Sequence, residues 1–157
     1  MMNFVTNLLS RPRPTFSEAS PRDAAAIAVI HAASFRRGWS EDEIQRLLID
    51  RAVAAHRVAI GRQLIGFILS RVAAGEAEIL SVAIAPAWRG RGLARLLLDL
   101  HLHRLAGLGA RTVFLEVDQE NDAALRLYEG AGFHEVARRQ GYYEGGSAAL
   151  VLRRDLG

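Results

Sequence analysis

The stretch Ile79-Leu-Ser-Val-Ala-Ile-Ala-Pro-Ala-Trp-Arg-Gly-Arg-Gly-Leu-Ala94 predicts an apolar strand, a glycine-containing turn and the start of a helix. The helix continues with leucines at helical spacing, separated by charged residues. We assign to its buried stripe Leu93, Leu96, Leu97, Leu100, Leu105 and Leu108. Main-chain N–H groups freed by the glycines, with the positive end of a helix behind them, are typical of a diphosphate-binding site.

The turn differs from the two commonest nucleotide-binding loops. It has no Gly-Lys-Ser/Thr, as in a P-loop, and no Gly-x-Gly-x-x-Gly, as in dinucleotide folds. Arg89-x-x-Gly92-x-Ala94 instead resembles the acetyl-coenzyme A (acetyl-CoA) signature of the GNAT superfamily of N-acetyltransferases. The plainer interpretation of the same residues is an ordinary strand–turn–helix with arginines on its solvent side.

A second motif follows downstream. Thr112-Val-Phe-Leu-Glu-Val117 alternates like a strand with two unlike faces. It precedes Asn121-x-x-Ala124-x-x-x-Tyr128-x-x-x-Gly132-Phe133, in which Asn121 is a natural N-cap of a helix. Residues 121, 124, 125 and 128 share one face of that helix. The same pattern recurs throughout the GNAT superfamily, and the resemblance covers residues 15–154.

Three segments narrow the resemblance to the RimI branch, the ribosomal-protein-alanine N-acetyltransferases. They are Leu115-Glu-Val117, the doublet Tyr142-Tyr143, and Phe35-Arg-Arg-Gly-Trp39-Ser40. The chain departs from the branch at Gly38, where proline is usual, at Gly141, where asparagine is frequent, and at residues 146–149, which lack an acidic residue. All three departures lie on the acceptor side, so they concern the substrate rather than the cofactor.

At 157 residues the chain should form one domain. Strands and helices interleave without a strict βαβ rhythm, so we expect an α/β fold with a mixed sheet. The resemblance implies a mixed, mostly antiparallel sheet of six to seven strands flanked by about four helices. It also implies two central strands splayed into a V that admits the pantetheine arm. We expect a flexible tail over residues 1–13 and the acetyltransferase domain over 14–157. The expected strands are 15–19, 57–60, 63–71, 76–85, 112–117, 134–139 and 148–154, and the expected helices are 22–33, 41–51, 93–108 and 122–130.

Two residues are the candidate catalytic groups. Glu116 is the candidate general base, since partial burial in an apolar strand would raise its pKa toward the working range. The resemblance assigns Glu116 the same role, with Glu120 and Asp118 as substitutes and a solvated glutamate as the plainer alternative. By resemblance alone, Tyr128 donates a proton to the leaving thiolate; a helix tyrosine at this spacing is otherwise an ordinary core residue.

Further site residues are expected to bind rather than react. Main-chain groups of the strand before the turn would face the pantetheine, and the Val82 N–H would stabilise the oxyanion. The expected cofactor-binding residues are Val82, Ala83, Ile84, Arg89, Gly90, Arg91, Gly92, Leu93, Ala94, Asn121 and Tyr128. The expected walls for an incoming peptide N-terminus are Trp39, Tyr142 and Tyr143, which would otherwise be simple surface or core aromatics.

The absence of cysteine narrows the mechanism, because it excludes a relay through an acetyl-cysteine. We therefore expect the amine to attack acetyl-CoA directly in a ternary complex. An α-amine has a pKa near 7.7–8.0 against about 10.4 for lysine, so a neutral α-amine costs roughly 3–4 kcal/mol less at neutral pH. A weak or water-mediated base suffices for an α-amine, which favours a protein N-terminus as the acceptor.

Composition sets the remaining expectations. No apolar run is long enough to span a membrane and the first residues do not resemble a signal peptide, so we expect a cytoplasmic protein. The chain has 20 basic residues, all arginine, and a net charge of +3, which suits a phosphate-rich cofactor or a ribosomal partner but follows equally from codon bias. The arginines are dispersed, so we expect no direct nucleic-acid binding. The histidines, which show no metal-binding spacing, are His31, His56, His101, His103 and His134.

The leading hypothesis is an acetyltransferase acting on a peptide or ribosomal-protein N-terminus, as a monomer or weak dimer. One alternative uses the same fold to acetylate lysine, a polyamine or a small-molecule amine. The other is a catalytically silent CoA-binding module.

Overall fold

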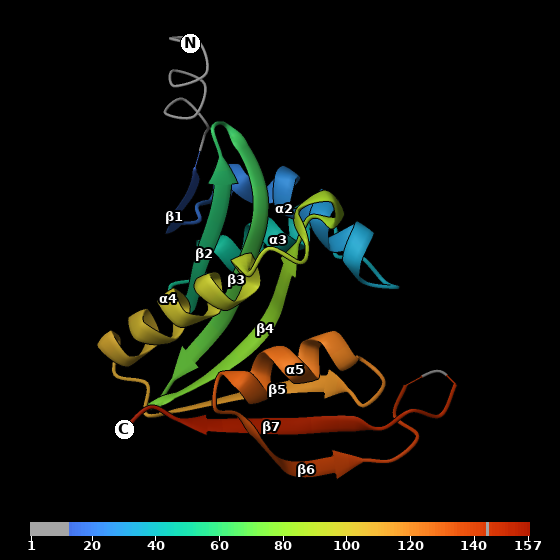
Figure 1. Ribbon diagram of the computed structural model, residues 1–157. Helices are drawn as coiled ribbons and strands as arrows, with labels where there is room; N and C mark the ends of the chain where they lie inside the picture. The colour runs from blue at the N-terminus through green and yellow to red at the C-terminus, as the bar shows by residue number, and fades with distance from the viewer. Residues whose placement is uncertain (1–12, 144) are drawn as a thin grey trace, which may run out of the picture.

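Seven strands form one sheet in the order β1-β2-β3-β4-β5-β7-β6 within residues 13–143 and 145–157, which the computed structural model describes (Figure 1). The strands are β1 (Pro14–Glu18), β2 (Val53–Ile60), β3 (Gln63–Ala73), β4 (Glu76–Ile84), β5 (Thr112–Asp118), β6 (His134–Arg139) and β7 (Ala149–Asp155). The helices are α2 (Ala24–Ser34), α3 (Glu41–Ile49), α4 (Leu93–Gly107) and α5 (Asp122–Gly130), with 3₁₀ turns η1 (Pro21–Asp23) and η2 (Pro86–Trp88).

This architecture confirms the predicted mixed α/β fold. Every neighbouring pair of strands is antiparallel except β4 and β5, which are parallel. The element bounds follow the sequence closely, with the largest difference at β2, which begins at Val53 rather than at 57. The helix predicted over 22–33 begins as η1, where the Asp23 carboxylate accepts a hydrogen bond from the Ser20 N–H at 2.8 Å. The predicted tail lies, apart from residue 13, outside the described residues.

The parallel pair β4–β5 separates soon after it forms. Its register runs only from Glu76↔Thr112 to Glu78↔Phe114, after which the strands diverge (Figure 1). β4 also contains a bulge, because Leu69 pairs with Ser81 while Ser70 pairs with Ile79. The divergence confirms the expected V between the two central strands.

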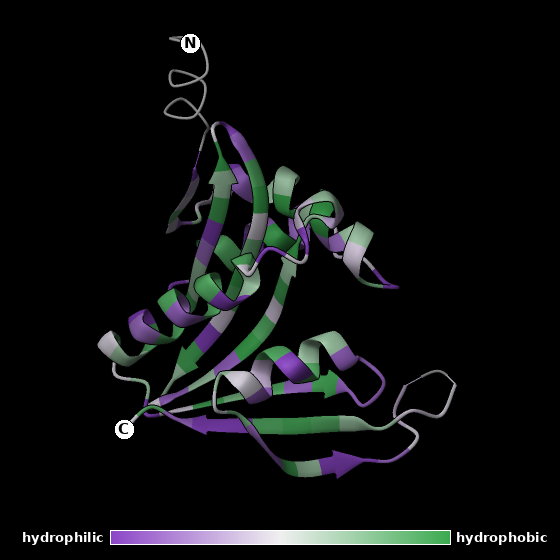
Figure 2. Cartoon of the chain, in the orientation of Figure 1, coloured by the Kyte–Doolittle hydropathy of each residue, from purple (hydrophilic) through white to green (hydrophobic). Residues whose placement is uncertain are grey.

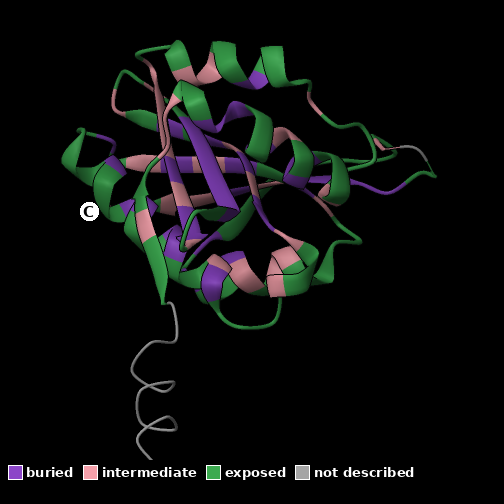
Figure 3. Cartoon of the chain, turned by 90° about the horizontal axis from the view of Figure 1, so that it is seen from above, coloured by how far each residue is buried: buried purple, intermediate pink, exposed green. Residues whose placement is uncertain are grey.

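The helices cover the two faces of the sheet separately. On one face, α2 and α3 pack on β2, β3 and β4 around a cluster that includes Ile27, Ile44 and Phe67. On the other, α4 and α5 contribute to a larger cluster that includes Leu97 and Leu115. Hydrophobic residues concentrate in the central strands (Figure 2), and the buried residues form a band along the middle of the sheet (Figure 3). No helix in the described part of the chain is long and apolar enough to cross a membrane.

The predicted leucine stripe of α4 is partly wrong. The buried residues are Leu93, Leu97, Leu98, His101, Leu102 and Leu105, whereas Leu96, Leu100 and Leu108 are exposed. The helix carries so many leucines that more than one face matches a helical period, and packing against β2, β3 and β4 selects one of them.

A chain of hydrogen-bonded polar side chains crosses this core and includes two of the histidines for which no metal-binding spacing was found, His56 and His101. The Nδ1 atoms of His56 and His101 lie 2.7 Å apart, and His101 Nε2 lies 2.6 Å from Ser70 Oγ. All three side chains are buried, so each hydrogen bond replaces one lost to water. His103, two residues along α4, is exposed, which confirms that the two helix histidines point to different sides.

Candidate active site

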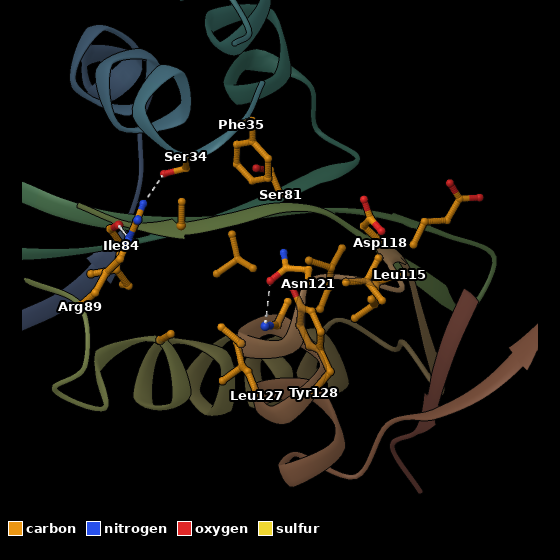
Figure 4. Close-up of a pocket in the computed structure, with 18 of the residues that line it drawn as sticks. Ser34, Phe35, Ser81, Ile84, Arg89, Leu115, Asp118, Asn121, Leu127 and Tyr128 are labelled. Atoms are coloured by element: carbon orange, nitrogen blue, oxygen red, sulfur yellow. Dashed lines mark hydrogen bonds between the residues drawn. The ribbon is translucent and has the colours of Figure 1, made fainter. Parts of the chain in front are cut away.

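A cavity of about 1230 Å³ occupies the space opened by the divergence of β4 and β5 (Figure 4). Its walls come from the second half of β4, the turn after it, the first turn of α4, the end of β5, α5, and the loop after α2. These segments lie on both faces of the sheet, so the cavity passes between the strands from one face to the other. The two motifs found in the sequence therefore meet at one site.

The turn after β4 is shaped for an anion. Gly90 and Gly92 both have a φ of +77°, a left-handed conformation that side chains rarely adopt, and a Cβ at either would point into open space. α4 then begins at Leu93 without any side-chain cap. The N–H groups of its first turn have no acceptor within the helix, so they are available to a diphosphate. Gly90, Gly92, Leu93 and Ala94 line the cavity as expected.

The two arginines of the turn have different positions. Arg89 lines the cavity, but its guanidinium is bonded within the protein: Nε donates to the Ile84 carbonyl at 2.9 Å and a terminal N–H donates to Ser34 Oγ at 3.0 Å. Arg89 thus ties the turn to the ends of β4 and α2. Arg91 does not line the cavity, and its guanidinium lies 4.6 Å from the centre of the Trp88 ring.

Main-chain groups of β4 face the cavity in alternation. The Ala85 N–H donates to the Ile65 carbonyl of β3. Because N–H directions alternate along a strand, the N–H groups of Val82 and Ile84 point to the other edge of β4, where β5 is no longer paired with it. Val82, Ala83 and Ile84 all line the cavity. The Ile84 carbonyl is already an acceptor for Arg89, which leaves the Val82 N–H and C=O and the Ile84 N–H for a ligand.

Glu116 lies on the cavity wall but is not partly buried. Val113, Leu115 and Val117 point into the core on the α4 side, which turns Glu116 to the face of α2 and α3. Those two helices pack on β2, β3 and β4, and so the side chain on β5 remains exposed. The expected burial is therefore wrong, although the carboxylate reaches the cavity.

The two alternative carboxylates lie close to Glu116 on the same wall. Asp118 and Glu120 both line the cavity, and Asp118 Oδ1 accepts a hydrogen bond from the Glu120 N–H at 2.9 Å. The carboxylates end β5 and begin the following loop, which makes this wall acidic.

Tyr128 enters the cavity from α5. Only 6% of the residue is exposed, its ring lies edge-on to Phe133 at 5.6 Å, and burial raises the pKa of its hydroxyl. No described residue hydrogen-bonds to that hydroxyl, which stays protonated at neutral pH. Asn121 caps α5 as predicted, its Oδ1 accepting from the Ala124 N–H at 3.2 Å, and also lines the cavity (Figure 4).

The structure brings only Tyr143 of the three predicted aromatic walls to the cavity. Burial first, and then the neighbouring carboxylates Glu116 and Asp118, raise the pKa of its hydroxyl. Tyr142 lies edge-on behind it with half its surface exposed, and Trp39 stacks on His31 at a ring distance of 4.5 Å.

The loop after α2 supplies the opposite wall with Phe35, Arg36 and Arg37. The resemblance to the RimI branch indicates this segment as the substrate side, but of its residues only Trp39 was predicted as a wall. Ser34 and Ser81 also line the cavity and were missed, since nothing in the sequence distinguishes them from ordinary helix and strand serines. Among residues 13–143 and 145–157, no three potential ligands lie close enough to hold a metal ion.

Comparisons with known proteins agree with this geometry. Residues 18–133 match the Acetyltransferase (GNAT) family. The chain is 32% identical over 146 residues to the [ribosomal protein bS18]-alanine N-acetyltransferase of Salmonella typhimurium, covering 88% of this chain and 95% of that protein. It is 41% identical over 90 residues to the N-alpha-acetyltransferase RimI of Mycobacterium tuberculosis, covering 57% of this chain and 55% of that protein.

The similarity extends to three-dimensional structure. The crystal structure of the ribosomal-protein-S18-alanine N-acetyltransferase from Escherichia coli superimposes with a TM-score of 0.86 at 26% identity, covering 92% of this chain and 95% of that one. The family match covers most of the chain and agrees with the splayed β4–β5 pair and the uncapped turn before α4. The chain therefore belongs to the GNAT family of acetyl-CoA-dependent N-acetyltransferases.

Proposed function

We propose that this protein transfers the acetyl group of acetyl-CoA to the α-amine of a protein N-terminus. The observation that carries the proposal is the cavity itself, which joins the uncapped glycine turn on the α4 side of the sheet to a mouth on the α2 side, where the acidic β5 wall lies opposite Arg36 and Arg37. A donor and an acceptor entering from opposite faces would meet between β4 and β5. That arrangement suits direct transfer without a covalent enzyme intermediate.

The residues present fit acetyl-CoA as the donor. The main-chain N–H groups of Gly90, Gly92 and the first turn of α4 would hold the diphosphate, and the Val82 and Ile84 amides would bind the pantetheine arm. Asn121 would contact the cofactor from α5. Acetyl-CoA supplies an activated thioester carbonyl, and the remaining chemistry falls to side chains of this protein.

We assign proton removal to Glu116. The amine must lose a proton as its nitrogen bonds to the carbonyl carbon, and the carboxylate at the acceptor mouth receives it directly or through one water. An exposed carboxylate is a weak base. A weak base suffices for an α-amine, because the pKa of the α-amine is near 7.7–8.0. The Val82 N–H would stabilise the oxyanion during the attack.

We assign proton donation to Tyr128. As the carbon–sulfur bond breaks, the leaving thiolate takes a proton from the Tyr128 hydroxyl, which burial keeps protonated and which has no partner among the described residues. Glu116 then releases its proton to solvent, and Tyr128 takes one up from solvent. Together the two groups move one proton from the amine side to the sulfur side of the cavity, and the overall reaction is balanced.

The relatives suggest the acceptor. Two are named as alanine N-acetyltransferases of ribosomal protein bS18 or S18, so we propose a ribosomal protein with N-terminal alanine as the acceptor. This implies a cytoplasmic enzyme whose catalytic domain spans 14–157. We further propose that it works as a monomer or weak dimer without contacting nucleic acid.

Mass spectrometry of a peptide that carries one free α-amine and one internal lysine tests the acceptor class. The proposal predicts acetylation of the α-amine, and no acetylation of a matched peptide whose α-amine is blocked. Modification of the lysine in the blocked peptide would instead support a lysine acetyltransferase. Absence of turnover with peptides and small amines, despite acetyl-CoA binding, would support a silent CoA-binding module.

A further inference from the structure

The Ser81 hydroxyl has no hydrogen-bond partner within residues 13–143 and 145–157. Among the described residues it is the only side-chain nitrogen or oxygen atom that is itself shielded from solvent and lacks a partner, and 6% of the residue is exposed. A buried hydroxyl without a partner costs stability, because the hydrogen bonds that it made to water are not replaced. An orphaned group of this kind in a cavity wall needs an explanation, and a ligand that is absent from the free protein provides one.

The bulge in β4 determines where Ser81 points. Ile79, before the bulge, and Val82, after it, both face the cluster on the α4 side of the sheet. The two residues between them, Leu80 and Ser81, therefore both lie on the opposite face. Leu80 is the extra residue of the bulge, and Ser81 follows it toward the side of α2 and α3. Without the bulge, strand alternation would place Ser81 on the same face as Ile79.

Ser81 therefore shares the acceptor face with Glu116. The two residues lie on the separated strands β4 and β5, on opposite walls of the same mouth. Ser81 is also the residue immediately before Val82, whose N–H points into the cavity. Figure 4 shows Ser81 and the Phe35 ring on the side of the cavity toward α2, above β4.

We propose that the Ser81 hydroxyl binds the acceptor's terminal amine, a role that rests on the function proposed above. A neutral α-amine has one lone pair, which attacks the thioester carbon, and two N–H groups. One proton passes to Glu116, and the other N–H donates to Ser81 Oγ and stays on the amide nitrogen. Because the hydroxyl is shielded before the acceptor binds, side chains of that wall must shift to expose it.

Two buried serines on neighbouring strands provide a matched test. Ser81→Ala removes the orphaned hydroxyl, and Ser70→Ala removes one that is hydrogen-bonded to His101 at 2.6 Å. Kinetics with an alanine-terminated peptide at saturating acetyl-CoA, calorimetric titration of acetyl-CoA, and urea unfolding are measured for both variants and for the wild type.

For Ser81→Ala we expect a fall of about tenfold in kcat/KM for the peptide, unchanged acetyl-CoA affinity and a urea midpoint no lower than that of the wild type. Ser70→Ala should lower the urea midpoint and leave kcat/KM for the peptide within about twofold, since its hydroxyl is remote from the acceptor. A Ser81→Ala variant with wild-type peptide kinetics would overturn the inference alone. Equal loss of peptide and acetyl-CoA binding would also overturn it, by showing a general structural role. A wild type that acetylates no α-amine would overturn the proposed function as well.

Discussion

Acidification should destabilise this protein through its buried histidines His31, His56 and His101, of which His101 has the largest shift in pKa. Burial, and secondarily the neighbouring His56, lowers the pKa of His101 from 6.5 to about 3. Below pH 6.5 the unfolded chain binds a proton at His101 that the folded protein does not bind, so acid favours unfolding. The stabilising contribution is complete above pH 6.5 and is lost as the pH falls toward the folded pKa. Each pH unit costs about 1.4 kcal/mol, so at about pH 5 the free energy of unfolding is about 2 kcal/mol lower on account of this group.

Urea unfolding followed by circular dichroism, at about pH 7.5 and about pH 5, measures the loss. His101→Gln is the informative variant, because glutamine does not titrate but can still hydrogen-bond to Ser70. The variant should lose about 2 kcal/mol less than the wild type between the two pH values, whatever its absolute stability. The carboxylates, His31 and His56 are present in both proteins, and so their contributions cancel in the comparison. Equal losses in the two proteins would refute the reasoning.

The remaining predictions concern catalysis and donor binding. Glu116→Gln should lower peptide acetylation most at neutral pH and progressively less above about pH 8, because the α-amine deprotonates in solution at the higher pH. A pH–rate profile of the variant that stays parallel to that of the wild type would argue against a base at this position. Tyr128→Phe should lower kcat by about 100-fold or more and change the free energy of unfolding by less than about 1 kcal/mol. Single-turnover kinetics and urea unfolding measure the two effects, and a wild-type rate would exclude Tyr128 as the acid. Gly92→Val should weaken acetyl-CoA binding measured by calorimetry. Gly61→Val is the matched control, because Gly61 has a φ of +57° and equally open space in the remote β2–β3 turn. It should lower the free energy of unfolding about as much as Gly92→Val without changing the affinity for acetyl-CoA. Equal effects of the two glycine variants on affinity would contradict an anion site at the turn.

The sequence was sufficient for the fold because its signals are local. Turn glycines, the Ser40 cap and the alternation of β5 each fix one element over a few residues, and all agree with the observed bounds. The V between β4 and β5 came from the resemblance, and it follows from a register that stops at Glu78↔Phe114. The orientation of α4 was partly wrong because which leucine face is buried depends on packing with the sheet.

The site was predicted less completely, for a physical reason. Main-chain contributions from the turn and β4 follow from local structure, and Gly90, Gly92 and Val82, which were predicted to bind the cofactor, line the cavity. Side-chain contributions depend on packing between distant segments. Arg91 turns to Trp88, Trp39 turns to His31, and neither reaches the cavity. A bulge in one strand decides the direction of Ser81, and no pattern in the sequence marks it.

A crystal structure with a bisubstrate conjugate, in which coenzyme A is joined through an acetyl linker to an alanine-terminated peptide, tests the central claim most directly. We predict that the diphosphate contacts the main-chain amides between Gly90 and the first turn of α4. The linker should pass between β4 and β5, and the peptide should leave beside Glu116 on the face of α2 and α3. A diphosphate bound away from this turn, or a peptide that leaves on the face of α4 and α5, would contradict the account.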